Sequence, residues 1–150
     1  MGIMTHGRRF YTLLGNRRIE RRKGFRKPED AMAVITEIND DNFDAEVSGS
    51  DAPVLLDFWA EWCHPCHMVA PEVEAIAEAE SSRLKVGKLN VDNSPNTAGR
   101  FGVFSIPTLL LFVDGEEKAR MVGVRRREAI LAEIQPYLAA PATAETLATE

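Results

Sequence analysis

Cysteine is scarce in this chain of 150 residues, which contains only Cys63 and Cys66. A framework of structural disulfides needs more cysteines at wider spacing, so the class of small disulfide-stapled scaffolds is excluded. In a reducing compartment, two cysteines separated by two residues are more often catalytic or metal-binding than structural. The low cysteine count therefore directs attention to one stretch, WCHPCH at residues 62–67.

Long apolar segments are also missing. The longest run, residues 106–113, has the length of a strand, whereas a membrane-spanning helix needs ~18 apolar residues. The segment FYTLLG at residues 10–15 is too short for the hydrophobic region of a secretory signal. These absences predict a soluble, cytoplasmic protein that does not bind membranes.

Positive charge is concentrated at one end of the chain. Residues 1–30 contain nine Lys and Arg against three acidic residues, although the formal net charge of the whole chain is −5. The remaining body is therefore strongly acidic and would repel phosphates, so we expect no nucleic-acid partner. We interpret residues 1–30 as a mobile, dispensable basic extension, and Met32 is a possible native start. The Ala/Thr-rich residues 140–150 are expected to be a disordered tail.

Between these ends, apolar periodicity predicts one α/β domain at residues 31–139. Strands are expected at 33–38, 53–60, 84–92, 108–115 and 117–123, and helices at 40–48, 65–80, 94–101 and 126–138. The Asp114–Gly115 pair predicts a hairpin between the last two strands. The order β-α-β-α-β-α-β-β-α predicts a central mixed sheet flanked by helices on both faces.

The two cysteines lie between a buried strand and a helix. At a helix N-terminus, free N–H groups and the helix dipole favour an anion, so the pKa of the Cys63 thiol should fall. Cys63 is then the nucleophile, and Cys66, one turn inside the helix, is the resolving thiol. Pro65 stiffens the link between them, and Trp59 and Trp62 flank the site with apolar surface.

Two other chemistries match the same stretch. The pattern C-x-x-C-H also describes haem attachment through Cys63 and Cys66 with His67 as axial ligand. That function needs export and a large pocket, and the following residues instead continue a packed helix. Zinc could bind both cysteines with His64 or His67, but tetrahedral sites usually draw ligands from two separated segments. The only other histidine is His6, so we expect adventitious metal binding at most.

Several separated motifs resemble the thioredoxin family. They are DFWAEWCHPCHMVAP at residues 57–71, KLNVD at 88–92, SIPTLLLF at 105–112, and the pair Val122 and Gly123. The resemblance covers about residues 33–139 and implies the thioredoxin fold. It also implies a protein-disulfide reductase that maintains cell redox homeostasis through dithiol–disulfide exchange.

The resemblance assigns roles to further residues. Asp57 matches a buried acid that exchanges a proton with the second thiol, and Lys88 matches a lysine that biases this proton. Pro107 matches a cis-proline that exposes the backbone of Ile106 to a substrate peptide, and Gly123 keeps the substrate groove open. The implied substrate-binding set is Trp59, Trp62, His64, Pro65, Ile106, Pro107, Val122 and Gly123. Each role has an ordinary alternative, such as a surface ion pair for Asp57 or a trans turn at Pro107.

Two residues depart from the family pattern, because His64 replaces its usual glycine and His67 its usual lysine. An imidazolium at His64 would favour the Cys63 thiolate, so we predict a more oxidising protein than an ordinary thioredoxin. A disulfide isomerase or oxidase therefore stays an alternative, as does a non-catalytic binding module.

The resemblance also implies the partners of the chain. They are disulfide-containing proteins and a flavin-dependent thioredoxin reductase that draws on NADPH. This chain itself is expected to bind no cofactor and to be a monomer.

Overall fold

The computed structural model describes residues 34–139; the expected basic extension at 1–30 and tail at 140–150 lie outside this range. No helix within residues 34–139 is both long and apolar enough to cross a membrane. The elements follow in the order β1 (Ile35–Ile38), η2 (Asp44–Ser48), β2 (Val54–Trp59), α1 (His64–Ala79), β3 (Lys85–Asn90), α2 (Pro95–Arg100), β4 (Thr108–Val113), β5 (Glu116–Val122), α3 (Arg127–Ile134) and η3 (Gln135–Tyr137).

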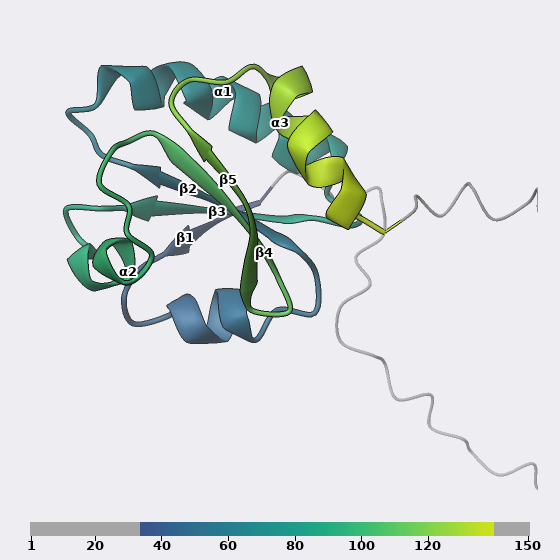
Figure 1. Cartoon of the computed structure of the whole chain (residues 1–150), viewed down its shortest axis with the longest axis horizontal. Helices are drawn as coiled ribbons and strands as arrows, with labels where there is room; N and C mark the ends of the chain where they lie inside the picture. The colour runs from purple at the N-terminus through teal and green to yellow at the C-terminus, as the bar shows by residue number, and fades with distance from the viewer. Residues whose placement is uncertain (1–33, 140–150) are drawn as a thin grey trace, which may run out of the picture.

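The five strands form one mixed sheet in the order β1-β3-β2-β4-β5. β1, β3 and β2 run parallel, whereas β4 runs antiparallel to both β2 and β5. Helices α1 and α3 lie on one side of the sheet, and η2 and α2 lie on the other (Figure 1). The predicted order of elements and the mixed sheet with helices on both faces are confirmed.

Each face of the sheet buries its own apolar cluster, because alternate side chains of a strand point to opposite faces. On the side of α1 and α3, Leu55, Val86 and Leu111 pack against the helices. On the side of η2 and α2, the cluster includes Phe58 and Phe112. β2 and β4 are therefore covered on both faces, which explains why their sequences read as nearly continuous apolar runs.

The last helix differs from its expected length. It ends at Ile134 and continues as the 3₁₀ turn η3, because Pro136 has no N–H to extend the α-helical hydrogen bonds. Its N-terminus is capped from another element, since the Glu72 carboxylate of α1 accepts the Arg127 N–H at 3.1 Å. This carboxylate also offsets the arginines at a helix end that favours negative charge.

Candidate active site

The two cysteines open helix α1. Cys63 is the N-cap in an extended conformation, and Pro65 lies in the first turn, where its missing N–H costs no hydrogen bond. The Cys63 sulfur accepts the Cys66 N–H at 3.3 Å. The two sulfurs are joined as a disulfide, with the Cα atoms 5.3 Å apart. The sequence therefore places Cys63 where free helical N–H groups favour a thiolate.

An apolar environment surrounds this disulfide. Cys63 and Cys66 are both buried, and together with Ala60 they form a small cluster against Trp59 and Ile106. A buried sulfur meets little water, so a charge on it depends on the backbone dipoles that face it. The Cys66 N–H is one such dipole.

Asp57 is a completely buried carboxylic acid on β2. Neither of its oxygens has a hydrogen-bond partner. Burial raises the pKa of Asp57 to about 6, while the positive charge of Lys88 acts in the opposite direction. Because Asp57 and Lys88 are paired across β2 and β3, they share one face of the sheet. The surface ion pair considered as an alternative for Asp57 is excluded by its burial.

The side chain of Lys88 lies against the ring of Trp59. Its ammonium lies 4.8 Å from the centre of the Trp59 ring, within the range of a cation–π interaction. Both residues line a pocket of about 380 Å³, together with Glu37 and Glu61. Lys88 is therefore half-buried and positioned against a ring rather than free on the surface.

The loop before β4 completes the site on the other side of the cysteines. The Ile106 carbonyl oxygen lies 3.8 Å from the Cys63 sulfur. The Ile106–Pro107 peptide bond is cis, as the family resemblance implies, and the alternative of a trans turn is excluded. Gly123 donates its N–H to the Pro107 carbonyl at 2.9 Å and has a φ of 88°, which only glycine adopts readily. Val122 is half exposed beside it.

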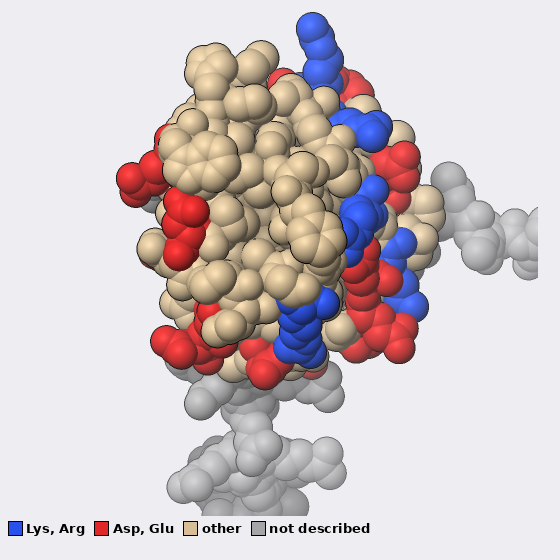
Figure 2. Space-filling view, turned by 60° about the vertical axis from the view of Figure 1, so that its left-hand side comes forward, with Lys and Arg blue, Asp and Glu red and all other residues tan. Residues whose placement is uncertain are grey.

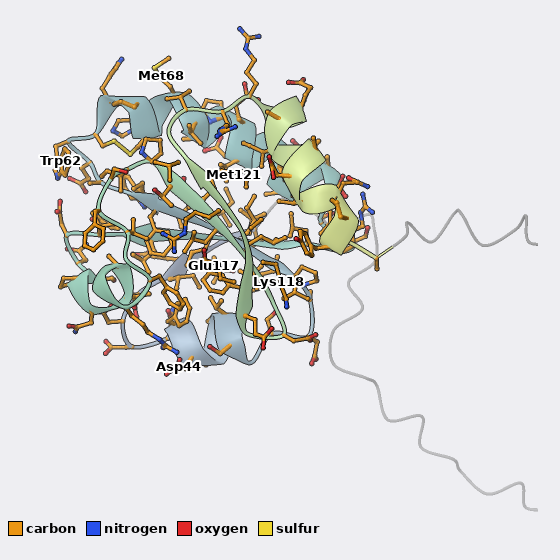
Figure 3. All side chains as sticks on the ribbon, in the orientation of Figure 1. Asp44, Trp62, Met68, Glu117, Lys118 and Met121 are labelled. Atoms are coloured by element: carbon orange, nitrogen blue, oxygen red, sulfur yellow. A yellow bond between two sulfur atoms is a disulfide. The ribbon has the colours of Figure 1, made fainter. Side chains whose placement is uncertain are left out.

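Trp62 and the two histidines form the exposed rim. The Trp62 indole N–H donates to Asp92 at 2.8 Å, while 70% of this residue is exposed. Figure 3 places Trp62 at the end of the molecule where β2 leads into α1. His64 and His67 are exposed, and a His67 ring nitrogen is hydrogen-bonded to the Glu61 carbonyl at 2.8 Å. Within residues 34–139, no three His, Cys, Asp or Glu side chains form a group suited to a metal ion.

The sequence analysis did not single out Asp92 or Phe104 as site residues. Asp92 fixes the Trp62 ring from a position 30 residues away, so no local pattern identifies the pair. Phe104 lies in the loop that contains Ile106, and 94% of it is exposed. The sequence offered only one indication of its role, which is that an apolar aromatic residue stands in a segment without helix or strand periodicity.

Comparison with known proteins assigns this arrangement to a family. A family model described as "Thioredoxin" matches residues 34–136. The thioredoxin of Mycobacterium tuberculosis is 49% identical over 106 residues, which cover 71% of this chain and 91% of that protein. The thioredoxin of Synechocystis is 41% identical over 107 residues, covering 71% and 100%. A chloroplastic M-type thioredoxin of Pisum sativum is 40% identical over 109 residues, covering 73% of this chain but only 63% of that protein.

Proposed function

The chain belongs to the thioredoxin family, and we propose that it works as a reductase of disulfide bonds in protein substrates. Family membership makes it a thioredoxin-type thiol–disulfide oxidoreductase. The direction of electron flow, the roles of single residues and the partners are our proposals. The observation that carries them is the Cys63–Cys66 disulfide at the start of α1, with the Cys66 N–H directed at the Cys63 sulfur.

The reaction begins from the reduced pair. The Cys63 thiolate attacks one sulfur of the substrate disulfide, forms a mixed disulfide and releases the other substrate sulfur as a thiolate. The Cys66 thiolate then attacks the Cys63 sulfur, so the substrate's second sulfur leaves and the Cys63–Cys66 bond forms. Two electrons pass from the cysteine pair to the substrate, whose thiolates take up protons.

Asp57 supplies the base for the second step. Cys66 must lose its proton before it can attack, and a carboxyl with a pKa of about 6 can accept that proton near neutral pH. Lys88 tunes this exchange because its charge stabilises the ionised form of Asp57. In this proposal the substrate segment binds against Trp62, Ile106 and Val122.

An external electron donor resets the oxidised pair. A flavin-dependent thioredoxin reductase that draws on NADPH fits this role, and no cofactor on this chain takes part in either exchange step. We further propose that the protein works as a monomer in the cytoplasm.

Insulin reduction tests the proposal directly. Wild type should reduce insulin with dithiothreitol or with thioredoxin reductase and NADPH, whereas Cys66→Ser should stall as a mixed disulfide through Cys63. Cys63→Ser serves as the matched control, because it retains one thiol but should capture no substrate. Equal insulin reduction by wild type and Cys66→Ser would contradict the mechanism and support a non-catalytic binding module.

A further inference from the structure

Phe104 presents an almost completely exposed aromatic ring on the loop that leads to Ile106. Its exposed fraction of 94% is the largest of any large apolar residue in the described range, where Trp62 follows with 70%. Figure 2 shows that the surface at this end of the molecule is largely free of charged side chains, which gather at its margins. A single exposed apolar residue is ordinary, but apolar surface continuous with a reactive group indicates a binding surface.

The backbone that carries Phe104 is fixed on both sides. Before it, the Arg120 guanidinium of β5 donates to the Phe101 carbonyl at 2.6 Å. After it, the Thr108 hydroxyl donates to the Ser105 carbonyl at 2.6 Å. The ring is therefore held out on an anchored loop, and a partner that binds it does not have to order the loop first.

Phe104 lies close along the chain to the residue that contacts the Cys63 sulfur. The Ile106 carbonyl lies 3.8 Å from the Cys63 sulfur, and Phe104 precedes Ile106 by two residues, at most about 7 Å of chain. A polypeptide that extends from Cys63 along this loop would meet Phe104.

We propose that Phe104 is a specificity-determining residue of the disulfide exchange. It favours substrates that carry an aromatic or large aliphatic side chain within two residues of the attacked cysteine. Such a side chain would cover the ring and remove apolar surface of both partners from water. This inference rests on the proposed function and adds a preference among its substrates.

The test uses disulfide-linked peptides that differ at one position. One pair of peptides has Phe or Ser two residues before the attacked cysteine. A second pair has Phe or Ser two residues after it. Full-length wild type should prefer the Phe peptide of at least one pair by about tenfold in kcat/KM. Phe104→Ser should lose this preference while reducing the Ser peptides at the wild-type rate and retaining the wild-type melting temperature.

Val34→Ser is the matched control, because Val34 is also exposed, at 61%, but precedes β1 at the end of the sheet opposite the cysteines. It should keep the preference of wild type. Equal rates for Phe and Ser peptides, or a preference that survives Phe104→Ser, would overturn the proposal while leaving the proposed function intact. A wild type that reduces neither the peptides nor glutathione disulfide would overturn both. A wild-type dimer that Phe104→Ser converts to a monomer would assign the ring to contact between copies and overturn the specificity role.

Discussion

The two faces of the sheet bury different kinds of groups. On the side of η2 and α2, three aromatic rings contact one another, with centroid distances of 5.1 to 5.6 Å among Phe43, Phe101 and Phe112. On the side of α1, the same sheet buries the carboxyl of Asp57 without a hydrogen-bond partner. Both faces bury apolar clusters that stabilise the fold. The face of α1, here called the reactive face, also holds this unpartnered carboxyl and the helix that the two cysteines open.

The largest expected effect comes from removing one ring of the aromatic cluster on the side of η2 and α2. Phe112→Ala should lower the free energy of unfolding by about 3–5 kcal/mol, because it leaves a cavity among the aromatic rings. Phe112 lies near the end of β4 that is remote from the cysteines, so kcat/KM of the folded variant should stay near that of wild type. Urea denaturation and the insulin assay measure these two quantities.

Phe104→Ala is the control for Phe112→Ala, because it removes the same side chain from an exposed position and should change stability by less than about 0.5 kcal/mol. Phe112→Leu, which leaves a smaller cavity, provides a folded variant if the alanine variant does not accumulate. A large activity loss in folded Phe112→Leu would show that the two faces are not independent.

The second effect comes from removing the buried carboxyl of Asp57, and it raises the stability of the protein instead of lowering it. The pKa of Asp57 is about 6 in the folded chain, so between pH 4 and 6 the folded state binds more protons than the unfolded state. The stability of wild type therefore falls as pH rises through this range. Asp57→Asn lacks this term and should be more stable than wild type by about 3 kcal/mol at pH 8, with little difference at pH 4.

Urea denaturation at several pH values measures the stability difference between Asp57→Asn and wild type. The same variant should reduce insulin about tenfold more slowly at neutral pH, because the resolving thiol loses its base. A stability difference that does not change with pH would show that the Asp57 carboxyl is not the group that titrates.

The sequence was sufficient to predict secondary structure where a local apolar pattern matches the burial of the segment. The apolar runs at β2 and β4 predicted covered strands, and the position of Cys63 ahead of an apolar-periodic segment predicted the N-terminus of α1. Those elements and their order are confirmed. The family resemblance predicted the buried acid and the cis-proline, whose placements the structure shows while their roles stay proposals.

Contacts between distant segments were not predictable in the same way. The Glu72 carboxylate that caps α3 and the Asp92 carboxylate that holds Trp62 act across 55 and 30 residues. Neither distance corresponds to a helical or strand period, so periodicity carries no information about the pairing. The exposure of Phe104 was not predictable for a related reason. It depends on the conformation of the loop, which Arg120 of β5 anchors at Phe101.

The smallest expected effect concerns charge at the rim of the reactive face. His64 is exposed and directly follows Cys63 at the start of α1. Its imidazolium should stabilise the Cys63 thiolate and with it the reduced pair, which makes the protein more oxidising than an ordinary thioredoxin. His64→Gly should therefore lower the reduction potential by about 10–20 mV, the size expected of an exposed charge at a helix end.

Equilibration with glutathione buffers measures this shift in potential. His67→Gln is the matched control, since His67 is also exposed but hydrogen-bonded to the Glu61 carbonyl, and it should shift the potential less. An unchanged potential in His64→Gly, together with a wild-type value as low as that of an ordinary thioredoxin, would show that the buried groups alone set the redox properties of this face.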